Sequence, residues 1–424
     1  MEFIRVFTNP RRSMQRFGFL KYPVWRASLS ATNNLSTLGK NLITAVTQKV
    51  SVVLTPHLQE YIMTALTDSI YTNLRSIATK PLENGQDKPT VHVEIQDVYL
   101  ADPGLPSRRG KLVSDDWNRY PYLAVDLGLL RKGTYSLLVR GQSFLSLVSE
   151  EEKKAFSRTE FTSINGTPNP FRLTFPQKLV LLFSFIEKDG DVLKILYSKL
   201  FPLSEPFSAK DAGNYLPEIY RAIAKESRAR ARSGDDLSRI QKLLDTADKI
   251  EAVKRNPSPG GKNPREHGIT VRLEAFVDLG LLSKPDPFAY RYQMTDATKT
   301  FFESLINSES IDHFLHYSFF KAANKAFNLN GEHRTDRETI LPKIQKAYIV
   351  LKSPLGYAPI IEVALLAGIY SITESGSYFE ISETTNTLKS LQKERPELVR
   401  FNVDLWGVLT FVKFNSDIMK VMGG

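Results

Sequence analysis

The chain has 424 residues and no cysteine, which excludes disulfides, thiolate metal sites and cysteine nucleophiles and fits a reducing cytosol. A hydrophobic content of 42% supports buried cores in two to four domains, and no apolar run approaches the about 20 residues that cross a bilayer. We therefore expect a cytoplasmic protein without membrane contact. The net charge of +10 favours a polyanionic partner, nucleic acid ahead of an anionic membrane surface.

The N-terminal stretch 1–26 is strongly basic, and we predict that it forms a basic arm. Arg11-Arg12 followed by Phe17 is faintly similar to a twin-arginine signal, but no apolar region or cleavage site follows, so we expect no export. A transit peptide remains an alternative, given the arginine and serine content. The basic residues are Arg5, Arg11, Arg12, Arg16, Lys21 and Arg26, against one acid, Glu2.

A long amphipathic helix is predicted from Pro56 to the residue before Pro81. Apolar residues recur there every three or four positions, which places them on one helix face, and we expect that face to pack in a core. A dimerising helix is the alternative, because the stripe persists over about five turns. The stripe consists of Leu58, Ile62, Leu66, Ile70, Leu74 and Ile77, and a strand is predicted after it at 91–98.

The middle third has the pattern of several helices. Residues 177–187 and 192–200 carry apolar residues at helical spacing, and Asp189-Gly190-Asp191 is predicted to interrupt them. Ser208 is a predicted helix cap, and Pro217 opens another helix.

A further helix is predicted from Asp235-Asp236 to about Asn256. The proline- and glycine-rich stretch 257–264 is the clearest linker, and we place a domain boundary in it, although an internal loop is the alternative. Helical spacing resumes at 306–329.

One short pattern occurs three times. Val-Asp-Leu-Gly-Leu-Leu at 125–130 is repeated at 277–282, and a looser copy follows at 363–370. In each copy an apolar helix precedes a glycine, and a turn, an extended run and another apolar stretch follow. Glycine tolerates the left-handed exit of a helix best, so Gly128, Gly280 and Gly368 are predicted helix ends.

The second and third copies extend the pattern furthest. In the second, 269–279 is predicted to be the helix before the glycine, 290–294 is the predicted strand, and Thr295 is the predicted cap of the next helix. In the third, Tyr357–Leu366 is predicted to be the helix before the glycine, and 373–376 is the predicted turn. Tyr378–Ile381 is the strand of that copy, and Ser382 is the cap.

This order of helix, glycine exit, hairpin and helix resembles the winged-helix superfamily, at the level of general pattern and not of a family signature. The resemblance implies a chain that is mainly α with short β-hairpins, built from tandem winged-helix modules joined by helical segments. Members commonly place the second helix of the motif in the major groove, and others are protein docking platforms. The predicted segments are a basic arm and helical region at 1–100, modules at 101–175, 257–330 and 331–424, and a helical linker region at 176–256.

Charge decides which copy is expected to contact DNA. The first copy offers Arg108, Arg109, Lys111, Arg119 and Lys132, and the second offers Lys262, Arg265, Arg272 and Lys284. In the third, the predicted recognition helix, Tyr357–Leu366, has no basic residue and carries Glu362, so we expect that copy to contact a protein.

A basic stripe is predicted outside the copies. Arg221, Lys225, Arg228 and Arg232 fall at i, i+4, i+7 and i+11, which is one helical face and could follow a phosphate backbone. A solvated helix face, or pairing with the acids of the next helix, is the alternative.

No nucleotide-binding loop, serine-hydrolase elbow or zinc-protease motif is present in the sequence. His313 and His316 share a helix face but are expected to pack and not to hold a metal. The one carboxylate grouping suited to a magnesium nuclease consists of Glu94, Asp97, Asp115 and Asp116.

The leading interpretation is a non-catalytic protein that binds duplex DNA, with no cofactor or metal, as a regulator, initiator or subunit of a larger complex. The alternatives are an adaptor whose winged helices bind proteins, or a metal-dependent nuclease. A homo-oligomer is compatible with each.

Overall fold

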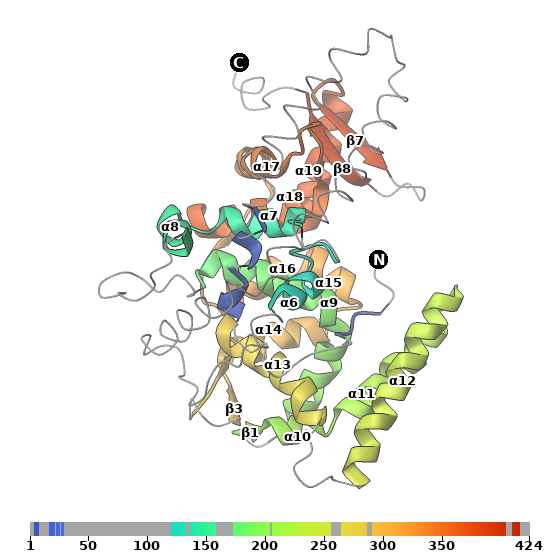
Figure 1. The fold of residues 1–424 in the computed structure, drawn as a ribbon. Coiled ribbons are helices and arrows are strands. Elements are labelled where there is room, and N and C mark those ends of the chain that lie inside the picture. Colours follow the sequence, from blue (N-terminus) through green and yellow to red (C-terminus); the bar gives the residue numbers. More distant parts are fainter. Residues whose placement is uncertain are drawn as a thin grey trace. The chain divides into compact units, whose positions relative to one another are not determined.

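The computed structural model describes residues 4–7, 17–21, 23–25, 27–28, 120–132, 136–157, 173–203, 206–255, 264–285, 291–403 and 409–415. In these ranges the chain is mainly helical with short strands in small sheets, as the sequence predicts (Figure 1). The helix at 56–81, the strand at 91–98 and the candidate nuclease residues lie outside them. The chain divides into a smaller compact unit, residues 19–141 with 148–171, and a larger one, residues 1–18, 142–147 and 172–424.

The smaller unit contains the first copy of the repeated pattern. Its helix α6 (Tyr120–Asp126) ends at Gly128, which has a φ of 72°. The Leu129 N–H then donates to the Ala124 carbonyl at 2.8 Å, and Leu130 and Leu137 form an antiparallel bridge. Three further elements belong wholly or partly to this unit: η1 (Phe17–Leu20), α7 (Val139–Ser146) and α8 (Glu150–Ser157).

In the larger unit, the first series of elements is built around the long helix α9 (Phe175–Leu200). Asp189-Gly190-Asp191 does not interrupt this helix. The glycine there makes room for Ile311, because a β-carbon at Gly190 would lie 2.8 Å from that side chain. The series continues with β1 (Phe207–Ser208), α10 (Ala209–Gly213), α11 (Leu216–Arg228), α12 (Gly234–Arg255), α13 (Pro264–Leu279), β2 (Leu282–Ser283), β3 (Arg291–Met294), α14 (Asp296–Ile306), α15 (Ile311–Tyr317) and α16 (Phe319–Ala326).

The second series of the larger unit has a similar order. It contains β4 (Glu332–His333), α17 (Arg337–Leu351), β5 (Ala358–Pro359), α18 (Ile360–Tyr370), the π-helical η2 (Ser371–Ser375), β6 (Ser377–Tyr378), α19 (Ile381–Glu394), β7 (Val399–Val403) and β8 (Leu409–Phe414). Figure 1 shows the β7–β8 pair next to α19.

Two three-stranded sheets have the same topology. In the first the strand order is β1-β3-β2, and in the second it is β5-β8-β7, with antiparallel neighbours in both. In each of these sheets the strand that comes first in the chain pairs with the one that comes last, so a helical segment lies between them in sequence. A parallel pair, β4 with β6, is a separate small sheet.

The second copy of the pattern matches the first in its backbone geometry. Gly280 ends α13 with a φ of 82°, as the sequence predicts, and the Leu281 N–H donates to the Phe276 carbonyl at 2.8 Å. Thr295 accepts the Thr298 N–H as the predicted cap of α14. Ser208 caps α10, and Pro217 lies at the start of α11, both as predicted.

The third copy differs from its prediction. Gly368 lies inside α18 and does not end a helix. It is a glycine because a β-carbon there would lie 2.3 Å from the Phe320 ring, and its absence lets α18 approach α16. The left-handed residue is Gly376, with a φ of 60°. The cap of α19 is Glu380 and not Ser382.

The aromatic core of the larger unit joins the first series to the N-terminal segment. Tyr197 of α9 stacks on Phe302 of α14, with ring centroids 3.4 Å apart, and Phe276 of α13 meets both rings edge-on. Phe17 meets the ring of Phe185 edge-on at 5.5 Å. Buried aromatic rings in such contacts contribute strongly to core energetics, and they hold α9, α13 and α14 together.

Candidate nucleic-acid interface

The described part of the first copy contains one of its predicted DNA contacts, Lys132. Its side chain is exposed directly after the Gly128 exit. Burial raises the pKa of the nearby Asp126 carboxyl to about 6, and the charge of Lys132 opposes that shift. The other predicted contacts, Arg108, Arg109, Lys111 and Arg119, lie outside the described residues.

Arg272 of the second copy does not face solvent. Both Arg272 and Asp189 have 0% side-chain exposure, and the guanidinium donates to the two carboxylate oxygens from Nε at 2.5 Å and from Nη2 at 2.8 Å. Its Nη1 donates to the Gly268 carbonyl at 2.7 Å. A buried charge requires this kind of full pairing, so Arg272 belongs to the core and the expectation of a DNA contact was wrong.

Lys284 is also held inside the larger unit. Its Nζ donates to Glu274 Oε1 at 2.8 Å, both side chains are nearly buried, and the ammonium lies 5.7 Å from the ring centroid of Tyr292. From Gly268 to Phe276, α13 is buried on all sides. A helix without an exposed face cannot enter a groove, and the Lys284 ammonium is already neutralised by Glu274, so neither is placed to contact DNA as expected. Lys262 and the Arg265 side chain lie outside the described residues.

The basic stripe is present in part. Helix α11 ends at Arg228, so Arg232 lies beyond it, and Arg221 is paired with Asp248 at 2.8 Å and Glu251 at 2.6 Å on α12. Lys225, Arg228 and Arg232 are exposed, and their side chains form no ion pair within the described residues. The Arg232 backbone N–H, and not its side chain, donates to Asp236. The acids of α12 therefore neutralise one of the four cations.

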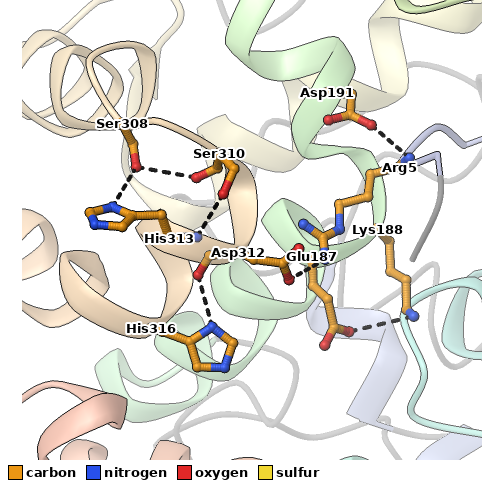
Figure 2. Close-up of polar contacts among 9 residues, drawn as sticks. All are labelled: Arg5, Glu187, Lys188, Asp191, Ser308, Ser310, Asp312, His313 and His316. Atoms are coloured by element: carbon orange, nitrogen blue, oxygen red, sulfur yellow. Dashed lines mark hydrogen bonds and ion pairs between the residues drawn. The ribbon is translucent and has the colours of Figure 1, made fainter. Parts of the chain in front are cut away.

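Residues 4–7, which belong to the predicted basic arm, are bound within the larger unit. The Arg5 N–H donates to Asp191 at 2.9 Å, and the Arg5 guanidinium donates to Asp312 at 2.6 Å (Figure 2). The Phe7 N–H donates to Asp189, also at 2.9 Å. The Arg5 side chain is nearly buried. Lys21 is likewise buried, against Glu152 in the smaller unit.

The two histidines of α15 are held by local hydrogen bonds (Figure 2). The His316 Nδ1 lies 2.8 Å from the Asp312 carbonyl oxygen, and the His313 Nδ1 lies 3.3 Å from the Ser308 hydroxyl. The Asp312 carboxylate binds Arg5, so it does not orient His313 toward Ser308. A serine nucleophile needs such an oriented base. Within the described ranges, no group of three or more His, Asp or Glu side chains is placed to hold a metal.

The best candidate surface belongs to α19, which sequence analysis did not assign to DNA. Ile381, Thr384, Leu388 and Leu391 bury one side of the helix. On the other side, Asn386, Lys389 and Lys393 are exposed, and Ser382 is half-buried. These four residues, which we call the α19 face, follow each other at i, i+4, i+7 and i+11 on one side of the helix.

The charges of the α19 face are not neutralised by neighbouring acids. Lys389 and Lys393 form no ion pair within the described residues. The acids of the same helix are engaged elsewhere: Glu394 forms a bidentate pair with Arg337, and Glu383 accepts from the Glu380 N–H and lies 2.9 Å from His333. The face therefore presents net positive charge.

The outer side of the β7–β8 pair adds two more cations. Arg400 and Lys413 are directly opposite each other in the antiparallel register, on the side that points away from buried Val412 and Phe414. Like charges in this position destabilise a sheet. The Lys413 ammonium lies 5.0 Å from the ring centroid of Tyr357, and Arg400 has no acidic partner within the described residues. An anionic ligand would remove the repulsion.

Glu380 fixes the start of α19. Its carboxylate accepts the Lys321 N–H at 2.8 Å and the Phe320 N–H at 3.1 Å at the start of α16, and its backbone N–H donates to Glu383 Oε2 at 2.6 Å in the first turn of α19. Burial raises the pKa of Glu380 to about 7, although those hydrogen bonds lower it. These hydrogen bonds fix the position of the α19 face relative to α16.

Sequence reasoning misses the α19 face because it treats Gly368 as a helix end, so it directs attention to the segment that forms α18 and not to α19. Helix α18, which overlaps the predicted helix Tyr357–Leu366, is almost entirely buried. The available signal was the spacing of Ser382, Asn386, Lys389 and Lys393, opposite the apolar residues of the same segment.

The described helices include none long and apolar enough to cross a membrane. Comparison of the chain with protein-family models, with curated proteins and with solved structures finds no match.

Proposed function

We propose that this chain binds duplex DNA without catalysis, and that residues 337–414 are the winged-helix module that contacts the duplex. The supporting observation is the α19 face, a polar and basic helix side followed by the β7–β8 pair. The order α17, β5, α18, α19, β7, β8, with η2 and β6 between α18 and α19, and the sheet order β5-β8-β7 resemble those of a winged helix-turn-helix, which supports the proposal. The series α9, β1, α10, α13, β2, β3 repeats it, with α11 and α12 inserted before α13.

The chemistry of the two surfaces suits a duplex. The major groove, about 12 Å wide, admits one helix, and α19 offers it hydroxyl, amide and ammonium groups on one side. Lys389 and Lys393 would neutralise phosphates on one side of the groove, and Arg400 with Lys413 would neutralise the backbone next to it. Release of counterions from those phosphates would supply most of the affinity.

The first series is a less favourable DNA contact. Helix α13 is buried from Gly268 to Phe276, and its Arg272 is paired with Asp189. We therefore propose a structural role for that series, and we transfer the DNA contact from the second copy of the pattern to the third.

A protein-docking role for the same module is the second candidate. Val403 is 58% exposed and Phe411 is 40% exposed on the β7–β8 strands, and exposed apolar side chains that lie together favour a protein partner. The magnesium nuclease alternative rests on residues outside the described ranges.

Fluorescence anisotropy with a labelled duplex tests the proposal. Lys389→Glu with Lys393→Glu should weaken binding by roughly ten-fold or more at about 0.1 M salt, because two phosphate contacts become repulsions. The control is Lys242→Glu with Lys249→Glu, two exposed lysines on α12, which makes the same change in net charge. Equal loss in both variants would indicate only a general charge effect, and no binding by the unaltered chain would exclude the function.

A further inference from the structure

The middle of α19 is composed of residues that do not favour a helix. Thr384, Thr385, Asn386 and Thr387 occupy four consecutive positions well inside the helix. Threonine loses rotamer freedom there, and asparagine competes with the backbone for hydrogen bonds, so both are commoner at caps and turns. A run of this kind costs helix stability and requires an explanation.

Packing and local hydrogen bonds explain the threonines in part, but not Asn386. Thr384 is buried against the core, and the Thr385 hydroxyl donates to the Ile381 carbonyl at 3.2 Å. Asn386 is exposed, lies away from both helix ends, and its amide makes no hydrogen bond within the described residues. Its side chain therefore stabilises nothing in the described part of the chain.

We propose that Asn386 reads one adenine in the major groove, an inference that rests on the proposed function. A carboxamide carries a donor and an acceptor side by side, which match adenine N7 and the N6 amino group in a bidentate contact. Neighbouring groups on the α19 face lack that pair: an ammonium only donates, and a hydroxyl does not span both atoms.

The position of Asn386 on the helix agrees with this role. In helix-turn-helix proteins the N-terminal part of the reading helix contacts base edges. Asn386 and Ser382 occupy the N-terminal half of the α19 face, and Lys389 and Lys393 occupy the C-terminal half. Glu383 does not compete for the base, because its carboxylate oxygens are engaged by His333 and the Glu380 N–H.

Selection from a randomised duplex library tests the assignment, with the full chain and with Asn386→Ala. Alanine raises helix propensity, so the variant should fold at least as well as the parent chain. The parent should select an adenine at one fixed position, and the variant should lose that preference alone, by about ten-fold or more. Thr387→Ala, at a half-buried position about 100° round α19 from Asn386, is the control and should leave the selected sequence unchanged.

A modified base then identifies the contacting atom. Replacing the selected adenine by 7-deazaadenine removes the N7 acceptor, so the parent should lose affinity while Asn386→Ala should bind both duplexes equally. An unchanged preference in Asn386→Ala, or salt-dependent binding by the parent without any sequence preference, overturns the inference and leaves DNA binding intact. Absence of any duplex binding by the parent overturns both.

Discussion

At the scale of single residues, glycines that look alike in sequence have different roles. Gly128 and Gly280 have φ values of 72° and 82°, and each turns the chain out of a helix. Gly368 stays helical and instead lets Phe320 approach the backbone. The sequence around the first two predicts the turn because the turn is local. The role of Gly368 depends on a residue 48 positions earlier, 368 minus 320, which a local pattern does not contain.

Gly280→Val should destabilise the larger unit by roughly 1–2 kcal/mol, because a side chain with a branched β-carbon is strained in the left-handed region. Gly234→Val is a suitable comparison. Gly234 opens α12, a β-carbon added to it would meet no atom within 4 Å, and its φ is not positive. Urea unfolding should show a lower midpoint for the first variant and a much smaller change for the second. Equal effects would argue against strain at Gly280.

Glu380 should make the stability of the chain depend on pH. Its pKa is raised from 4.5 to about 7 by burial, so its contribution is complete below about pH 4.5 and is lost as the pH rises through 7. Glu380→Gln cannot ionise, and the stability of the unaltered chain relative to this variant should fall by up to about 3 kcal/mol between those limits. Urea unfolding of both proteins at about pH 5 and about pH 8 measures this. A difference that does not vary with pH would contradict the assignment.

At the scale of elements, the sequence predicts local signals and fails where tertiary contacts decide. Caps at Ser208 and Thr295 are recognisable, because a cap involves residues only three positions apart. The sequence assigns Arg272 to DNA, because it does not reveal that Asp189 lies opposite that arginine in the core. It also predicts a break in the helical segment at Asp189, which instead lies inside α9 as the buried partner of Arg272.

Each charge of the buried Arg272–Asp189 pair should require the other for α9 to pack stably on α13. Arg272→Met leaves the Asp189 carboxylate buried without its guanidinium, which should cost about 3–5 kcal/mol. The double variant with Asp189→Leu removes both charges and should recover much of that stability. Thermal unfolding followed by circular dichroism measures both. If the single and double variants were equally unstable, the cost would come from poorer packing and not from the unpaired charge.

At the scale of the whole molecule, the sequence predicts the class, mainly α with short β elements, but not which module presents a surface. Two series with the same strand order belong to one compact unit. In the first, helix α13 is buried over most of its length. In the second, the corresponding helix α19 keeps an exposed side. Enclosure arises from segments distant in sequence, such as residues 4–7, so the distribution of charge along the chain does not show which helix is exposed.

The salt dependence of duplex binding tests the central claim most directly. The slope of log affinity against log salt concentration decreases by about 0.9 for each phosphate that the protein no longer neutralises, so Lys389→Ala with Lys393→Ala should flatten it by about 1.8. Lys225→Ala with Arg228→Ala, on the exposed part of α11, should leave it unchanged. A flatter slope in the α11 variant, together with an unchanged slope in the α19 variant, would contradict the proposal and place the interface on the basic stripe.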